Sequence, residues 1–180
     1  KKKGLQCRCI RCREIKNDII EKDDKIIYTI ETFKASGGTE YFISANTTKT
    51  DKLCGFLRFR INNETQKPFF KCLEDCSLIR ELHVLGGMKN VGDYSNNNYQ
   101  HKGIGKKLIK MAEDISIQNN ILQIAVISGV GVRPYYAKHH YELKDTFMVK
   151  TLKKPNYDYI IYICLFLFDL MMMAYFHFLY

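Results

Sequence analysis

The chain has 180 residues, of which 46% are hydrophobic and 26% are charged. This composition excludes a disordered polypeptide, and the length fits one globular domain with a sizeable core rather than two. The formal net charge of +9 favours an acidic partner, such as nucleic acid or an anionic surface. Charge alone leaves open the alternative of a basic surface that serves only solubility.

The N-terminal segment, residues 1–24, is basic, contains cysteines and lacks periodicity, which predicts a linker or docking segment. Its Cys7-x-Cys9-x-x-Cys12 spacing can supply three soft ligands to zinc, with ordinary free cysteines as the alternative. A fourth ligand would come from elsewhere, and the candidates are Cys72, Cys76 and His83. We expect the arginines beside the thiols to contact RNA phosphates; they are Arg8, Arg11 and Arg13.

Cysteine usage also indicates the compartment. The seven cysteines are an odd number, and nothing at the start resembles a secretory signal. A reducing, cytosolic compartment is therefore favoured over a disulfide scaffold. Because the chain begins with three lysines and no methionine, we expect it to be the C-terminal part of a longer polypeptide.

The apolar patterning predicts an α/β domain at residues 25–151. Residues 25–44 alternate between helix-like and strand-like runs around a Ser-Gly-Gly turn, and residues 86–99 predict a loop rich in Gly and Asn. The other predicted elements are strands at 53–61 and 78–85, a helix at 103–119, a strand at 122–128, a short helix at 134–140 and a strand at 141–150. This order predicts a central mixed sheet flanked by helices.

The run Gln100-His101-Lys102-Gly103-Ile104-Gly105 lies between a strand-like segment and the best helix of the chain. A helix N-terminus presents unpaired N–H groups and a positive dipole end, which attract phosphates. The two glycines let a ligand approach the backbone where a side chain would block it. The run therefore predicts a pyrophosphate cradle, with an ordinary turn as the alternative.

Residues 159–180 contain only two strongly polar side chains, Asp169 and His177. As a helix the segment would extend about 33 Å, enough to cross a hydrocarbon core of about 30 Å. Its aromatic ends suit a membrane interface, and Lys153-Lys154 in the juxtamembrane linker 152–158 suits a cytosolic flank. We expect a transmembrane tail that holds the protein on the cytoplasmic face of a membrane. A hydrophobic helix buried in a partner or in another domain is the alternative.

Several blocks of the sequence together resemble a known family. Gln-x-x-Gly-x-Gly followed by a helix is similar to the phosphate loop of the GNAT acetyltransferases, which bind acetyl-CoA. Within that superfamily the chain resembles the C-terminal acetyltransferase lobe of the catalytic subunit of the Elongator complex, a tRNA uridine-modifying family. The segments that carry the resemblance are 7–14, 55–60, 79–86, 100–105, 124–133, 135–136 and 141–150. The chain departs from the family at Leu85, where tyrosine is usual, and at His139-His140.

The resemblance implies a GNAT fold and assigns candidate site residues. Acetyl-CoA would contact one strand mainly through its backbone, at Glu81, Leu82, His83 and Val84. Its pyrophosphate would bind at Gln100, Lys102, Gly103, Ile104, Gly105 and Lys106. The candidate catalytic residues are Tyr135 and Tyr136, and Tyr136 is the better candidate to give the CoA thiolate a proton or a hydrogen bond.

The resemblance also implies an activity. Together with an upstream radical-SAM half, which would carry S-adenosylmethionine and a 4Fe-4S cluster, the lobe would modify C5 of the wobble uridine of tRNA. The implied partners are tRNA and other Elongator subunits. Two alternatives stay open: a lysine N-acetyltransferase acting on histones or other proteins, and a membrane-tethered RNA-binding module with a relict acyl-CoA pocket. A basic surface favours tRNA, because lysine-rich tails would be repelled.

Deleting residues 159–180 should release the protein into the soluble fraction and leave acetyl-CoA binding intact, because the matched blocks end near Lys150. The measurement is membrane fractionation with carbonate and high-salt washes, with the intact chain as the control. If the intact chain washes off membranes, or if the truncated chain fails to fold, the segment is a buried or partner-binding helix instead.

Overall fold

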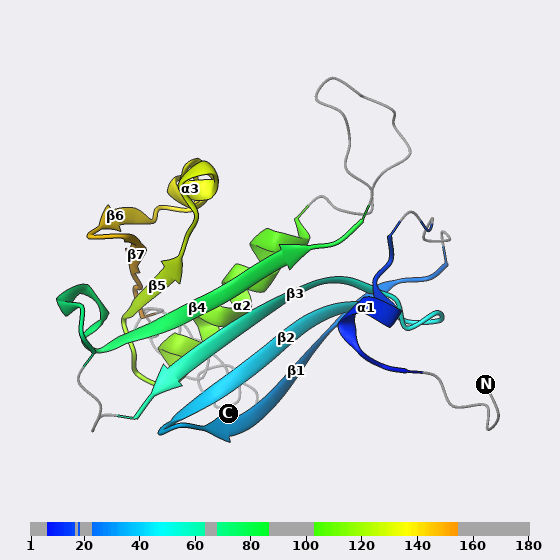
Figure 1. Cartoon of the computed structure of the whole chain (residues 1–180), viewed down its shortest axis with the longest axis horizontal. Coiled ribbons are helices and arrows are strands. Elements are labelled where there is room, and N and C mark those ends of the chain that lie inside the picture. The colour runs from blue at the N-terminus through cyan, green and yellow to red at the C-terminus, as the bar shows by residue number, and fades with distance from the viewer. Residues whose placement is uncertain (1–6, 17, 19–22, 64–67, 87–102, 155–180) are drawn as a thin grey trace, which may run out of the picture.

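The computed structural model describes residues 7–16, 18, 23–63, 68–86 and 103–154 (Figure 1). The strands are β1 (Ile26–Ala35), β2 (Gly38–Thr47), β3 (Leu53–Asn62), β4 (Cys76–Val84), β5 (Gln123–Ile127), β6 (Glu142–Lys144) and β7 (Phe147–Thr151). The helices are α1 (Ile10–Arg13), α2 (Ile104–Gln118) and α3 (Arg133–Ala137), with short 3-10 turns η1 (Lys71–Leu73) and η2 (Val130–Val132). The described strands form one sheet in the order β1-β2-β3-β4-β5-β7-β6.

The N-terminal half of the sheet is an antiparallel meander from β1 to β4. Ser36 and Gly37 make the first turn at φ 46° and 71°, a conformation that suits tight hairpins with right-handed strand twist. The helix-like part of the prediction for residues 25–44 is therefore wrong, since the segment is one β-hairpin. β-branched and aromatic side chains in β1 favour a strand even where their spacing imitates a helix.

The C-terminal half begins with the crossover from β4 through α2 to β5, which pairs with β4 in parallel. This parallel pair within an otherwise antiparallel sheet confirms the predicted α/β domain with a central mixed sheet. The strand expected at 141–150 is a hairpin instead, β6 and β7, which turns at Asp145 with φ 53°. No glycine marked that turn in the sequence.

Helix α2 lies across one face of the central strands and confirms the helix predicted at 103–119 (Figure 1). Its apolar stripe, which includes Leu108 and Ala112, is buried against the sheet. Gly55 on β3 makes this close approach feasible: a Cβ there would lie 2.9 Å from the His83 carbonyl oxygen and 3.0 Å from Ile104 Cγ2. The start of α2 is thus fixed directly on the sheet.

Part of the segment that we expected to be a linker packs on this lobe. Ile15 is only 2% exposed and belongs to the main core cluster. Its backbone N–H donates a hydrogen bond of 3.0 Å to the Leu53 carbonyl, and Glu14 forms an isolated parallel bridge with Leu53. The chain around α1 is therefore held against the start of β3.

The sheet face opposite α2 carries charged networks. Buried Glu40 accepts hydrogen bonds of 2.8 Å from both Arg60 and Arg80. Burial would raise the pKa of Glu40, but the hydrogen bonds and charges of the two arginines outweigh it and hold the pKa below its ordinary value. Because one carboxylate serves two guanidinium groups, each of which stays charged, this network leaves a surplus of positive charge.

The segment predicted to cross a membrane, residues 159–180, lies outside the described residues. Among the helices that the structure does describe, none combines the length and the apolar character that a membrane span requires. The Gly- and Asn-rich loop predicted at 86–99 is described only at Gly86.

Candidate functional site

The centre of the candidate site is the place where β4 and β5 separate. Their parallel pairing runs from Cys76 and Gln123 to Ile79 and Val126, and then stops. Among the described strands, β4 then pairs with β3 alone, on its other side, and continues to Val84. Beyond Ile79, no described strand pairs with the β5-facing edge of β4, which suits an extended ligand that pairs with the backbone.

A cavity of about 530 Å³ lies at this opening. It is lined by Leu82, Val84, Gly103, Gly105, Lys106, Val132, Tyr135, Tyr136 and His139. The structure thus brings together seven of the residues predicted for cofactor binding or catalysis, from β4, α2 and α3. Gln100 and Lys102, also predicted, lie outside the described residues, and Ile104 is a buried core residue at the start of α2.

The two positions at the start of α2, Gly103 and Gly105, require glycine for different structural reasons. Gly103, at the N-cap, has φ 99°, a left-handed conformation that other residues rarely adopt. A Cβ on Gly105 would lie 2.6 Å from the Tyr135 hydroxyl and 3.4 Å from Val84 Cγ2, so a side chain there would fill the cavity. The first turn of α2 carries N–H groups without helical partners, and these residues fit a phosphate ligand.

The tyrosine pair closes the other side of the cavity. Tyr136 is buried, and its ring lies edge-on to those of Tyr135 and Tyr141, with centroids 5.3 Å and 5.9 Å away. Burial, with a smaller effect of Tyr135, raises the pKa of Tyr136 to about 12. Tyr136 is therefore protonated at neutral pH and can donate, but not remove, a proton.

Two lining residues were missed by sequence reasoning, Val132 and His139. The ring centroid of His139 is 5.0 Å from that of Tyr135. Burial, and then the charges of Lys106 and Lys150, lower the pKa of His139, so the neutral ring is favoured. The four-residue spacing from Tyr135 on a short helical segment was the signal that could have identified it.

Two predicted residues of β4 have side chains on the opposite face. Strand alternation directs Leu82 and Val84 towards the cavity and Glu81 and His83 away from it. Glu81 instead forms an ion pair of 3.0 Å with Arg58, and His83 Nε2 lies 3.6 Å from Glu81. Any contact of Glu81 or His83 with a ligand in the cavity would therefore use the backbone, and the Glu81 carboxylate is not placed to act there as a base.

The N-terminal thiols form a compact group. The sulfur atoms of Cys7, Cys9 and Cys12 all lie within 4.8 Å of one another. Hydrogen bonds from the Cys12 backbone and from the other two thiols lower the pKa of Cys9 to about 7, while hydrogen bonding to its neighbours raises that of Cys12 to about 11. The fourth ligands considered from the sequence do not join this group in the described structure: they are Cys72, Cys76 and His83.

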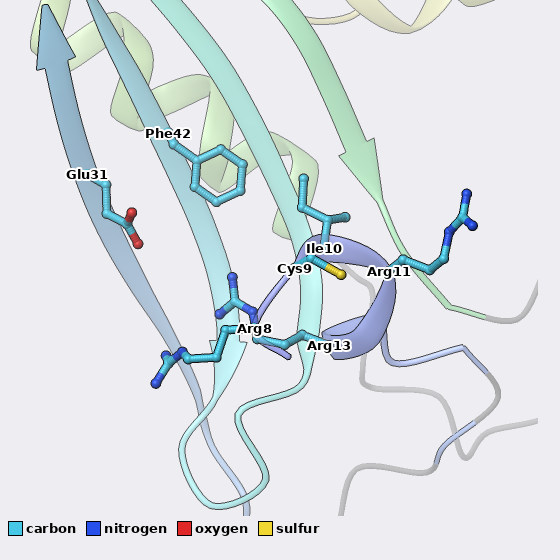
Figure 2. A pocket seen from close by; sticks show the side chains of 7 residues that line it. All are labelled: Arg8, Cys9, Ile10, Arg11, Arg13, Glu31 and Phe42. Atoms are coloured by element: carbon cyan, nitrogen blue, oxygen red, sulfur yellow. The ribbon is translucent and has the colours of Figure 1, made fainter. Parts of the chain in front are cut away.

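The predicted RNA-binding arginines line a second cavity, of about 620 Å³, which we call the arginine hollow (Figure 2). Its lining comprises Arg8, Cys9, Ile10, Arg11, Arg13, Glu31 and Phe42. Arg8 and Arg13 share one carboxylate, Asp51, at 3.2 Å and 3.5 Å. The hollow has no lining residue in common with the cavity between β4, α2 and α3.

A family model described as the acetyltransferase (GNAT) family matches residues 10–141. The chain belongs to the GNAT acetyltransferase family. This assignment agrees with the separation of β4 and β5 and with the glycine cradle at α2, and it confirms the GNAT fold implied by the sequence blocks. GNAT proteins use acetyl-CoA, so the fold of this lobe implies that it binds acetyl-CoA.

Two individual relatives show which members of the family this chain is similar to. A tRNA uridine(34) acetyltransferase of Methanocaldococcus infernus is 42% identical over 159 residues, which cover 84% of this chain and 29% of that protein. Elongator complex protein 3 of Homo sapiens is 40% identical over 157 residues, or 83% of this chain and 28% of that protein. The resemblance to the Elongator lobe is confirmed, and the GNAT lobe spans less than a third of the length of these relatives.

A solved structure gives the same result. The archaeal Methanocaldococcus infernus Elp3 with an N-terminal deletion of residues 1–46 matches with a TM-score of 0.70 and 41% identity. The match covers 84% of this chain and 37% of that chain. The arrangement of this GNAT lobe is thus shared with a related protein, and not only its sequence motifs.

Gly105→Glu should abolish binding of acetyl-CoA, because the new side chain fills the cradle and adds negative charge where phosphates bind. The fold should persist, since the Tyr135 hydroxyl end that a Cβ meets can move. Calorimetry with a non-hydrolysable acetyl-CoA analogue measures the effect. Gly129→Glu is the matched control, because a Cβ on Gly129 meets nothing within 4 Å. Unchanged affinity in a folded Gly105→Glu variant would contradict this assignment.

Proposed function

We propose that this chain is the acetyl-CoA-binding lobe of an enzyme that modifies uridine 34 of tRNA. The observation that carries the proposal is the cavity where β4 leaves β5, bounded by Gly103 and Gly105, in a chain 42% identical to a tRNA uridine(34) acetyltransferase. Because the chain spans only 29% of that relative, we propose the tRNA-modifying activity for the complete polypeptide and not for this lobe alone. A radical-SAM half with S-adenosylmethionine and a 4Fe-4S cluster would occupy the remainder.

The residues of the cavity divide the binding of acetyl-CoA between them. The first-turn N–H groups of α2 would hold the pyrophosphate, and Lys106 would add a positive charge at the same end. The unpaired edge of β4 at Leu82 and Val84 would bind the extended arm of the ligand through its backbone groups. Acetyl-CoA itself supplies the acetyl group as an activated thioester.

Tyr136 would act as the proton donor. Its buried hydroxyl holds its proton at neutral pH, because the pKa is raised to about 12. A proton donor beside a departing thiolate stabilises the negative charge that develops on sulfur. The Tyr136 ring packs against Tyr141, which belongs to a hydrogen-bond network. In this network Glu113 on α2 accepts hydrogen bonds from Tyr141 at 3.1 Å and from Lys150 at 2.8 Å.

RNA is favoured over a lysine-rich peptide as the second substrate. The arginine hollow and the Glu40 network each place two guanidinium groups on one carboxylate, which leaves positive charge on the sheet face opposite α2. Such a surface attracts phosphates and repels lysine side chains. Other Elongator subunits are proposed as partners, since relatives of this chain carry the name Elongator complex protein 3.

Tyr136→Phe should slow tRNA-dependent cleavage of acetyl-CoA by about 100-fold without weakening acetyl-CoA binding, because only the proton donor is lost. Release of free CoA, measured with the complete natural polypeptide and tRNA, reports the cleavage. Tyr41→Phe, on β2 and packed against Phe59, is the control. Acetylation of a lysine peptide in place of tRNA-dependent cleavage would favour the lysine acetyltransferase instead.

We further propose that Cys7, Cys9 and Cys12 bind zinc, since three thiols within 4.8 Å fit three corners of a tetrahedral site. Purified protein should contain about one zinc per chain by elemental analysis, and Cys9→Ser should remove it. Cys54→Ser is the matched control, because the buried Cys54 thiol bonds to the Lys52 carbonyl. Zinc-free wild-type protein, prepared without chelators, would exclude the site.

The membrane anchor at residues 159–180, and with it a location on the cytoplasmic face of a membrane, is also a proposal. Its support is the length and the apolar composition of that segment.

A further inference from the structure

We propose that the arginine hollow binds one unstacked RNA nucleotide, and that Glu31 selects bases that present an amino donor over uracil. The inference rests on the proposed function, because it takes RNA as the substrate. It goes further by assigning a second site, on the opposite face of the sheet, which would hold a nucleotide other than the one that is modified.

The charge of the hollow suits a phosphate. Arg8 and Arg13 both pair with Asp51, so their guanidinium groups retain one positive charge that is not neutralised. The side chain of Arg13 is 16% exposed, and its buried Nε has no hydrogen-bond partner among the residues that the structure describes. Arginines held in this way offer several N–H donors in a fixed arrangement, which is the geometry that phosphate oxygens accept.

An aromatic ring beside these arginines suits a base. Phe42 on β2 lines the hollow together with Ile10 of α1 (Figure 2). It is held in a row of rings across three strands, since its centroid lies 5.5 Å from that of Phe56, which in turn lies 5.1 Å from that of His83. Both contacts are stacked, with interplanar angles of 27°. A ring fixed by such neighbours can stack a base with little further loss of side-chain entropy.

Glu31 gives the hollow a means of discriminating bases. It is the cross-strand partner of Phe42, and Figure 2 shows its carboxylate on the side of the strands where Arg8 and Arg13 lie. Within the described residues Glu31 forms no ion pair, although three arginines line the same hollow. An ionised carboxylate only accepts hydrogen bonds, so it matches the amino groups of cytosine, adenine and guanine. The O4 oxygen of uracil would face it as a second acceptor.

The size of the hollow limits the ligand. A volume of about 620 Å³ lies in the range of sites for small molecules and admits one nucleotide, not a duplex. Recognition would therefore require an unpaired base, as in a loop, where bases can be turned out and stacked on side chains. Because this hollow and the cavity between β4, α2 and α3 share no lining residue, a nucleotide held here would be a different one from the uridine that is modified.

The test is fluorescence anisotropy of the full chain with labelled oligocytidylate and oligouridylate hexamers at one fixed ionic strength. We expect oligocytidylate to bind about tenfold more tightly than oligouridylate. Glu31→Gln should reduce this preference to about twofold or less. Phe42→Leu should weaken the binding of both hexamers about tenfold. Glu142→Gln and Phe33→Leu are the matched controls, since both residues are exposed on strands and neither lines the hollow.

The outcomes separate this inference from the proposed function. If tRNA binds but neither Glu31→Gln nor Phe42→Leu changes hexamer binding or preference, the hollow is not a nucleotide site and the proposed function stands. If the chain binds an acetyl-CoA analogue but no RNA, both the hollow and the tRNA substrate are wrong. Glu31 is exposed, so Glu31→Gln should fold and tests the inference even if Phe42→Leu proves unstable. Binding of the acetyl-CoA analogue reports whether each variant is folded.

Discussion

The early end of the pairing between β4 and β5 is the constraint on which the rest of this lobe depends. Because the two parallel strands separate after Ile79 and Val126, no described strand pairs with the β5-facing edge of β4 beyond that point. A ligand that supplies hydrogen bonds can pair with that edge. The crossover helix α2 then has to start beside the gap, which is why its N-terminus, and not its side, faces the cavity.

The same sheet separates two kinds of chemistry. The face covered by α2 is apolar and close-packed, and the cavity lined by Tyr136 and His139 lies at its edge, where both side chains are partly removed from water. The opposite face has no long helix over it in the described chain, and it carries arginines, carboxylates and stacked rings. Strand alternation enforces the division, since neighbouring residues such as Leu82 and His83 must point to opposite faces.

Sequence reasoning succeeded where an element depends on local backbone geometry. The helix that begins after Gly103 follows from residues close together in the chain, so its pattern is visible in the sequence alone. It failed where contacts are tertiary: nothing in the sequence joins Phe42 to Arg8, or makes Ile15 a core residue. The expectation that β4 contacts acetyl-CoA mainly through its backbone is compatible with the strand, because alternation directs the Glu81 and His83 side chains away from the cavity.

The topology has a further consequence for how the lobe assembles. Strands β1 to β4 pair with their sequence neighbours through short turns, whereas β5 reaches β4 only after the chain has passed through α2. Closing that long connection loses more chain entropy, and contacts distant in sequence form late in folding. We therefore expect a nascent or partly unfolded chain to possess the meander first and the gap between β4 and β5 last. Marginal destabilisation would then abolish cofactor binding while most of the sheet persists.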